Sequence, residues 1–470
     1  MGPPDGPGNV QPGLKIGEQA GPLLYPDRDQ RPGGRWSYPG LVGDILRLAA
    51  VERALAHLIA GWVVKVPELD DKLKMATMLE PAIVRAHALR GHALTLLERD
   101  TARLVVGRDW IEPLRELDEA DDPTRVVEAV LGEILPFLLR RYQAVLARLD
   151  PLYDARLLAT VRSAVAELQP EGTTVSGRHT AALDAAWSVA APCLVPLDEA
   201  LWGPGDRVPV PARPAHRPRP ERGARAHLRA MSRLEPDDLA GELNDNVMAE
   251  LCAMELMSRC SYEHPDMPWA FHIGACRHAT DEARHAQMFR RLLAERGFDE
   301  SALIQHGSNY EYAYEFPECE VGSRRELLWR LLILCTVLEA LAIDKLPLEI
   351  AIRDTLRQLD VARALDYAST DELFHTENGL RWTRTLCDEH NLDPLIERER
   401  VHGRFFGRQR DERARYLGAD PERAAREIAI LEGPDPDGMT FRSRTEAELR
   451  RRASFTDADC EQVDRWGYNG

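Results

Sequence analysis

The chain has 470 residues, of which 44% are hydrophobic and 29% charged, and its formal net charge is −17. This length exceeds one ordinary compact core and predicts two domains. The acidic balance argues against a general affinity for nucleic acid, because phosphate binding needs a local surplus of Lys and Arg. The sequence contains no run of about eighteen apolar residues, which is the length needed to span a bilayer. The sequence therefore predicts neither nucleic-acid binding nor membrane insertion.

The first forty residues are rich in Gly and Pro and show no sustained hydrophobic period, which predicts an extended N-terminal arm over residues 1–40. They lack the basic start and apolar core of a secretory signal, so we expect a cytoplasmic protein. The eight cysteines are irregularly spaced and form no CxxC pair. That pattern favours reduced thiols packed in the core.

Beyond the arm the hydrophobic pattern is helical, and no convincing strand alternation is found. Residues 41–203 are expected to form a first helical domain. Six prolines then fall between Pro204 and Pro220, which forbids a helix and predicts a stiff extended linker over residues 204–223. The domain boundary is therefore placed in this linker.

A second helical domain is expected over residues 224–392. Its apolar periodicity predicts four long helices, with a long crossover between the second and the third, over residues 237–262, 268–296, 324–344 and 361–390. Two antiparallel pairs joined by a crossover make a four-helix bundle. Residues 393–470 are strongly charged and are predicted to be a helical C-terminal extension, with short helices near residues 397–416 and 421–431.

The pattern Thr-Asp-Glu-x-x-His occurs twice, at residues 280–285 and 370–375. A Glu and a His three residues apart face the same side of a helix, so each motif can offer a metal ion one carboxylate and one imidazole. Carboxylates bridge hard cations, and imidazoles complete their coordination. The match over ninety residues of separation also suggests an internal duplication.

Each motif has a candidate partner carboxylate on the preceding predicted helix. Glu250 lies 32 residues before Glu282, and Glu339 lies 33 before Glu372. Two antiparallel helices of about 13 to 16 residues and a turn account for this spacing. Both partner glutamates fall on the apolar stripe of their helix, where an unpaired carboxylate is costly to bury. The pattern thus predicts a two-metal site with six ligands: Glu250, Glu282, His285, Glu339, Glu372 and His375.

The competing interpretation is a set of solvated glutamates and satisfied core histidines, since a single Glu-x-x-His pair often arises by chance. The complete set with matching spacing favours the metal site. Glu255 and Asp344 each follow a partner glutamate by five residues. They turn about 140° away from it, so we expect them to support the ligands or to lie on the surface.

At these residues the chain resembles the ferritin-like superfamily of di-iron carboxylate proteins, in particular an uncharacterised bacterial branch described only as a domain of unknown function. The similar segments are residues 249–256, 281–297, 337–344 and 371–375. The resemblance implies an all-α protein with a ferritin-like four-helix bundle in its C-terminal domain and two iron ions as cofactor. Manganese–iron and di-manganese occupancy stay open, because the ligands suit several ions.

The resemblance also assigns roles within the site. Glu282 and Glu372 are implied to bridge the two ions, and no protein base beyond the metal ligands is implied to be catalytic. Asp281 and Asp371 are implied to orient the imidazoles of the opposite half through the second ring nitrogen.

The two halves of the site differ at one position, because His278 lies one turn before Glu282 whereas the equivalent residue is Ala368. Some oxygenases that resemble this family carry an extra histidine ligand. His278 is therefore a candidate seventh ligand, although a polar core or pocket histidine is the favoured interpretation.

The N-terminal helical domain is expected to be a degenerate copy of the bundle, because glutamates fall on successive predicted helices at Glu52, Glu80, Glu133 and Glu167. The histidines are missing, since Ile83 and Pro170 occupy the places three residues after Glu80 and Glu167. Any metal there would lack ligands. We expect no metal in this domain and a structural or substrate-gating role.

These observations predict an O2-dependent oxidase or oxygenase that hydroxylates, desaturates or N-oxygenates a small organic substrate, with specialised metabolism as one setting. An external electron donor is expected, and a homodimer is considered. A ferroxidase or iron-handling protein, and a metal-stabilised binding module, are the alternatives. Aromatic residues could line the substrate pocket, although core packing is favoured for each one singly: Trp269, Tyr310, Tyr312, Tyr314 and Phe374.

Overall fold

A computed structural model of the chain describes residues 38–96, 112–168, 177–188, 236–298, 319–320, 322–419 and 447–466. Within these ranges the regular elements are all helices and no strand is present, which confirms the predicted all-α class. Most of the predicted arm, the proline-rich linker and the helix expected near residues 421–431 lie outside the described residues, and the domain limits stay predictions. The seven cysteines within the described ranges are free thiols.

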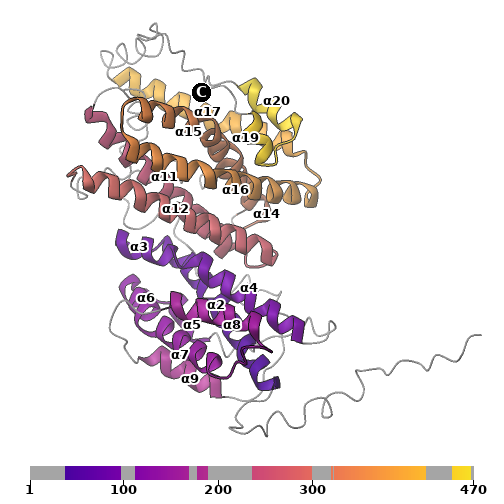
Figure 1. Ribbon diagram of the computed structural model, residues 1–470. Helices are drawn as coiled ribbons and strands as arrows, with labels where there is room; N and C mark the ends of the chain where they lie inside the picture. Colours follow the sequence, from indigo (N-terminus) through magenta and orange to yellow (C-terminus); the bar gives the residue numbers. More distant parts are fainter. Residues whose placement is uncertain are drawn as a thin grey trace, which may run out of the picture.

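The N-terminal half is a set of helices of unequal length. In chain order they are α2 (Tyr38–Val63), α3 (Leu69–Ala76), α4 (Leu79–Leu96), α5 (Glu112–Asp118), α6 (Pro123–Ala129), the π-helix η4 (Val130–Ile134), α7 (Leu135–Leu146), α8 (Ala155–Glu167) and α9 (Arg178–Ser188). The long helix α2 is apolar on nearly every side because α4, α5 and α7 pack on it from one half and α11 from the other. It is the central helix of this half (Figure 1).

The C-terminal half contains the four long helices that the sequence predicted, followed by shorter ones. They are α11 (Pro236–Glu263), α12 (Trp269–Glu295), α14 (Arg324–Leu331) with the π-helix η6 (Leu332–Leu338) and α15 (Glu339–Thr355), α16 (Leu359–Glu389), α17 (Pro394–Ala419), α19 (Ala447–Arg452) and α20 (Asp457–Trp466). The third predicted helix was expected to end at residue 344, but it continues through Pro347 to Thr355.

The ends of these helices follow from local chemistry. Asp122 accepts a hydrogen bond from the Thr124 N–H at the start of α6, and Ser323 accepts one from the Glu326 N–H at the start of α14. After α12 the backbone of Gly297 takes a φ of 75°, a left-handed conformation that glycine adopts without steric cost. The bounds of α12 are therefore fixed within one or two residues of the predicted ones.

The long helices of the C-terminal half pack as two pairs, α11 with α12 and α15 with α16, and α12 also contacts α16. The opposite side of the α11–α12 pair packs against α2 and α4. This pair is therefore the part of the C-terminal half that contacts the N-terminal half (Figure 1). Buried apolar side chains form one continuous cluster that extends from α2 to α17. Burial of this cluster is the main favourable contribution to the fold.

Two buried ion pairs attach further segments to the long helices. Lys72 of α3 binds Glu255 of α11, and Arg450 of α19 binds Asp344 of α15. Glu255 and Asp344 are only 0% and 3% exposed. Both acids therefore lie in the interior, which rules out the surface role considered for them.

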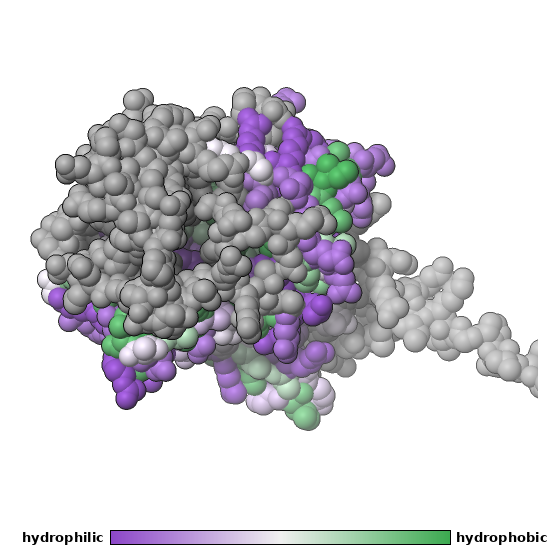
Figure 2. Space-filling view, turned by 90° about the horizontal axis from the view of Figure 1, so that it is seen from above, coloured by the Kyte–Doolittle hydropathy of each residue, from purple (hydrophilic) through white to green (hydrophobic). Residues whose placement is uncertain are grey.

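Seen from above, the described part of the surface is mostly hydrophilic, with small hydrophobic patches between the polar side chains (Figure 2). This distribution is expected for helices whose apolar stripes face the core and whose polar faces point to the solvent. Among the described residues, no helix is both long and apolar enough to cross a membrane.

Candidate metal centre

Seven side chains of four helical segments meet between α11, α12, α15 and α16. They form two groups that share Glu282, one composed of His278, Glu282, Glu339 and His375, the other of Glu250, Glu282, His285 and Glu372. Within each group the potential ligand atoms all lie within 4.8 Å of one another. The structure thus brings together the six predicted ligands and His278.

The first group is held together by short polar contacts and ring stacking. His278 Nε2 lies 3.0 Å from Glu282 Oε1 and 3.3 Å from Glu339 Oε1. The imidazoles of His278 and His375 stack with centroids 3.7 Å apart and planes 3° apart. His375 Nδ1 lies 3.0 Å from Glu372 Oε2, which joins this group to the second.

The second group has the same types of contact. His285 Nδ1 lies 3.2 Å from Glu282 Oε2 and 3.7 Å from Glu250 Oε2. Glu282 therefore presents Oε1 to the first group and Oε2 to the second. A carboxylate in this position can bridge two cations.

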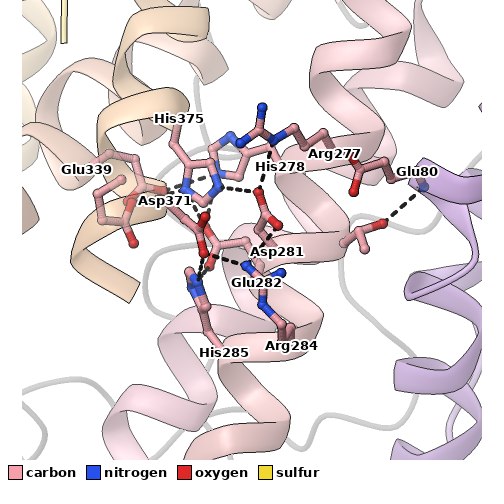
Figure 3. Close-up of polar contacts among 12 residues, drawn as sticks. Glu80, Arg277, His278, Asp281, Glu282, Arg284, His285, Glu339, Asp371 and His375 are labelled. Carbon is pink, nitrogen blue, oxygen red and sulfur yellow. Dashed lines mark hydrogen bonds and ion pairs between the residues drawn. The ribbon is translucent and has the colours of Figure 1, made fainter. Parts of the chain in front are cut away.

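Two aspartates of the motifs contact the remaining ring nitrogens across the site (Figure 3). His285 Nε2 lies 3.0 Å from Asp371 Oδ2, and His375 Nε2 lies 3.5 Å from Asp281 Oδ2. Each aspartate thus faces the imidazole of the opposite half, as the resemblance implied. A carboxylate at the second nitrogen fixes the tautomer and the orientation of a metal-binding imidazole.

Arg284, for which the sequence predicted no role, connects the two aspartates. Its guanidinium donates to Asp281 Oδ1 at 3.0 Å and also to Asp371 Oδ2. The equivalent residue of the second motif is Phe374, whose ring lies 3.7 Å from the guanidinium carbon of Arg277. An arginine in one motif and a phenylalanine in the other is the sequence feature that could have indicated a role for Arg284.

The π-helix η6 ends immediately before Glu339, at the point where the chain enters the site. Here α16 approaches η6 so closely that a Cβ on Gly379 would lie 2.0 Å from the Cβ of Cys335, so a glycine is required. π-Helices often occur at functional sites. The apolar period on which the helix prediction relied does not reveal such a local change of pitch.

Burial and mutual repulsion give the carboxylates of the site unequal proton affinities. Burial, together with the neighbouring Glu282, raises the pKa of Glu250 well above its ordinary value, and burial together with Glu339 does the same for Glu372. Burial also acts to raise the pKa of Glu282, but hydrogen bonds with Glu250 and His278 outweigh it and hold that pKa well below the ordinary range. Closely spaced carboxylates therefore share protons when no other cation is present.

The imidazoles differ as well. Burial lowers the pKa of His285, but hydrogen bonds to Asp371 and Glu250 outweigh it, so the net shift is upward. The pKa of His278 is also raised, because contacts with Cys335 and Glu282 outweigh its burial. Burial and the nearby His278 lower the pKa of His375.

This donor set fits divalent metal ions. Four carboxylates in a buried cluster carry a large desolvation and repulsion cost unless protons or cations neutralise them. Carboxylate oxygens and imidazole nitrogens are the donors that iron and manganese accept. The buried cluster of histidines and glutamates can therefore hold a metal ion.

His278 lies within the first group, with its side chain fully buried. This position is compatible both with the candidate seventh ligand and with the polar core histidine that the sequence favoured. Of the proposed pocket residues, Trp269 stacks under the Arg53 guanidinium at 4.6 Å, and Phe374 stacks under that of Arg277 with its ring centroid 6.2 Å from that of His375. Tyr310, Tyr312 and Tyr314 lie outside the described residues.

The four glutamates noted in the N-terminal half do not meet at one place. Glu52 and Glu167 both bind Arg85, and Glu133 accepts hydrogen bonds from the N–H groups of His179 and Thr180 at the start of α9.

Glu80 lies at the boundary between the halves, where its backbone N–H donates to Thr280 Oγ1 at 3.1 Å (Figure 3). The threonine of the first motif also donates to the Ala76 carbonyl at 3.0 Å. Thr280 therefore binds α12 to the N-terminal half on the side away from the ligands.

A family model described as "Protein of unknown function (DUF455)" matches residues 178–430. This range includes all seven residues of the two groups. No curated protein and no solved structure matches the chain.

Proposed function

Because this chain belongs to the DUF455 family of proteins of unknown function, we propose its function from the buried site itself: an O2-dependent di-iron oxidoreductase that oxidises a small organic substrate. One observation carries the proposal, which is that Glu282 offers one oxygen to each of two four-residue groups. A shared carboxylate between two nitrogen-and-oxygen donor sets is the arrangement that two neighbouring ions need.

The four long helices support the view that this half is a ferritin-like bundle. Their connectivity is two pairs with a crossover between them, and the Glu-x-x-His motifs project inward from the second and fourth long helices, α12 and α16. This is the ligand pattern of ferritin-like carboxylate proteins. Two iron ions are the proposed occupants, with manganese as the alternative.

A bound ferrous pair would supply electrons for the reduction of O2. In a desaturation, the substrate gives up two hydrogens and an external donor gives two electrons and two protons, so that O2 leaves as two waters. In a hydroxylation the same donor equivalents release one water, and the second oxygen atom enters the substrate. This stoichiometry requires an electron donor, which remains a predicted partner.

The chain's own residues hold and orient the donor atoms. Asp371 Oδ2 lies 3.0 Å from His285 Nε2 and can accept its N–H, whereas Asp281 Oδ2 lies 3.5 Å from His375 Nε2. In both imidazoles Nδ1 is the nitrogen that faces the glutamates. His278 and His375 are fully buried and stacked, which excludes water from one side of the site. Glu250 is the most open ligand, with 16% of its side chain exposed, and we propose that small molecules enter beside it.

The test begins with elemental analysis of the purified protein beside a Glu282→Ala, Glu372→Ala double variant. About two irons per chain, lost in the variant, would support the proposed pair. An Arg291→Gln variant on the exposed face of α12 serves as the matched control and should keep its metal.

Stopped-flow absorbance then follows the reaction of the ferrous protein with O2. A transient visible band that is absent from the double variant would support O2 activation. Release of ferric mineral without any transient would instead favour the ferroxidase alternative. Metal that stays bound in the double variant would contradict the site itself.

A further inference from the structure

Two short helices near the C-terminus dock on the α15–α16 pair. We call residues 447–466, which include α19 and α20, the C-terminal clamp. The clamp lies beyond residues 178–430, which the family model matches. Helix α19 contacts both α15 and α16, and α20 contacts α17, at the end of the molecule away from the N-terminal half (Figure 1). The clamp therefore packs on the helix that carries Glu339.

A small apolar core joins the clamp to two helices of the candidate metal centre. It is separate from the main hydrophobic cluster and consists of Ala340 and Ile343 of α15, Leu380 of α16, and Ala453, Phe455, Cys460 and Val463 of the clamp. Ala340 directly follows Glu339, and Ile343 lies about one turn after it. This core thus packs against the turn of α15 that presents a candidate ligand.

A buried ion pair fixes the clamp to the next turn of α15. Arg450 of α19 and Asp344 of α15 form this pair, and each side chain is only 1% exposed. Asp344 points about 140° away from Glu339 around the helix, toward the clamp. Loss of one partner of a buried pair is costly, because it leaves the other charge in the interior. The pair therefore ties the position of α15 to the position of α19.

A second group of polar contacts holds the other helix of the clamp. Asp459 accepts hydrogen bonds from Arg384 of α16 at 2.6 Å and from Arg398 of α17 at 2.7 Å. Gln462 accepts from Arg398 Nε at 2.8 Å and donates to the Leu395 carbonyl at 2.6 Å. Hydrogen bonds with a charged partner are stronger than neutral ones. The clamp is thus anchored through both of its helices.

The helix that carries Glu339 is irregular on both sides of the turn that the clamp contacts. The π-helix η6 ends directly before Glu339, and Pro347 lies inside α15. Because proline has no N–H, the Ile343 carbonyl loses its helical hydrogen bond. Helical hydrogen bonds therefore hold this stretch less firmly than a regular helix, so the position of Glu339 depends more on the helices packed around it.

We propose that the C-terminal clamp and the metal ions stabilise each other. Docking of the clamp holds Glu339 where it can bind metal, and bound metal in turn strengthens the docking. Arg450 is a positioning residue, since it acts on Glu339 through α15. This inference rests on the proposed metal centre. Coupling between two binding events is reciprocal and is typically about 5- to 150-fold, so loss of docking should weaken metal binding by a factor in that range.

Hydrogen exchange followed by mass spectrometry on the full-length chain gives the direct test. Manganese(II) is the probe, because carboxylates and imidazoles accept it. Peptides from residues 447–466 should exchange about 5- to 150-fold more slowly in the manganese-bound protein than in chelator-treated protein. Peptides of α8, in the N-terminal half, are the reference and should not change. Unchanged exchange in the clamp of a manganese-bound chain would overturn the proposal.

Two adjacent arginines of α19 provide a matched pair of variants. Arg450 is buried against Asp344, whereas the side chain of Arg451 is 59% exposed and pairs with Asp457 at the surface. Competition with a chelator measures the manganese affinity. Arg450→Met should weaken it about 5- to 150-fold, and Arg451→Met should leave it unchanged. Equal affinities of the two variants would show that the clamp does not act on the metal centre.

A third variant separates docking from the charge of Asp344. Phe455→Ala removes a buried ring of the clamp without changing any charge, and it should also weaken manganese binding. Combining it with Arg450→Met should add little, because either change already loosens the clamp. Fully additive losses would contradict a shared docking step.

The outcomes distinguish this inference from the proposed centre. A chain that binds manganese through Glu282 while its clamp exchanges at the same rate contradicts only the coupling. A chain that binds no metal contradicts the centre itself, and with it the coupling. The exchange experiment uses the unaltered chain, so it decides the matter even where a clamp variant fails to fold.

Discussion

The buried Glu52 of the N-terminal half and the glutamates of the candidate metal centre have different partners. In the N-terminal half, Arg85 donates two hydrogen bonds to the fully buried Glu52, from Nε to Oε1 at 2.6 Å and from Nη2 to Oε2 at 2.9 Å. The Tyr142 hydroxyl donates to the same carboxylate at 2.9 Å. In the C-terminal half four glutamates meet only each other and three imidazoles. The first arrangement carries its own cation, and the second needs one from outside.

The N-terminal half, which the sequence predicted to be a degenerate copy of the bundle, pairs its buried Glu52 with an arginine. Both halves contain a π-helix, with Glu133 inside η4 and Glu339 directly after η6. The guanidinium of Arg85 lies between Glu52 and Glu167, on two of the successive helices that suggested a decayed site. An arginine at such a place satisfies the carboxylates without a metal and without pH-sensitive ligands.

The largest effect should come from removing the built-in cation. Arg85→Met leaves Glu52 charged and buried, and we expect a loss of about 3–5 kcal/mol in the free energy of unfolding. Chemical denaturation followed by circular dichroism measures this loss. The double variant Arg85→Met, Glu52→Gln should recover a large part of it. An unchanged midpoint in the single variant would break the comparison.

The next largest effect concerns the metal affinity of the candidate centre. Arg284→Gln removes the donor that joins Asp281 to Asp371, so both imidazoles lose an oriented partner. We expect metal affinity to fall about 10- to 100-fold, the range seen when outer partners of metal ligands are removed. Competition with a chelator measures it. Arg291→Gln is the control, and equal affinities for the two variants would show that Arg284 has no role.

The metal-free protein should be unusually sensitive to alkaline pH. The pKa values of Glu250, Glu372, His278 and His285 are raised in the folded state, so that state binds more protons than the unfolded chain. Stability should therefore fall as pH rises, by about 1 kcal/mol per pH unit for each extra proton held. His375, whose pKa is lowered, opposes this only near and below its ordinary value of 6.5.

The pH dependence is measured as the melting temperature of chelator-treated protein between about pH 7 and 9. Metal should abolish the decline, because bound ligands are already deprotonated. A flat profile without metal would show that the carboxylates of the centre are not protonated in the folded state.

The smallest effect is expected at the edge of the Arg85 cluster. The side chain of Glu167 is 43% exposed, and its contact with Arg85 Nη1 is 3.0 Å long. Exposed ion pairs contribute little, so Glu167→Gln should cost less than about 1 kcal/mol. Chemical denaturation of Glu167→Gln and of Arg85→Met, measured side by side, compares the losses in the free energy of unfolding. A loss as large as that of Arg85→Met would mean that Glu167, rather than Glu52, is the main partner.

The sequence predicted the long helices well because their apolar stripes are long and regular, and the spacing of Glu250 from Glu282 followed from helix geometry. The π-helix η6 was not predictable, since its altered pitch arises within an apolar run that reads equally well as α-helix. The short helix α19 was missed because tertiary contacts such as the Arg450–Asp344 pair stabilise it, and these leave no local period.

Within the site, spacing identified the residues but not all of their relations. The stacking of His278 on His375 joins positions that are far apart in the chain, and only packing reveals it. The role of Arg284 likewise depends on the distance between two helices.

Helix α12 lies where the two halves contact each other, and this position limits the substitutions that its sequence can accept. Fifteen of its 27 residues are buried, and they face the N-terminal helices on one side and the candidate centre on the other. A helix at the margin of a protein can accept substitutions on its outer face, but α12 has little outer face left. Among related chains, α12 should therefore change little, with variation confined to exposed positions such as Arg291.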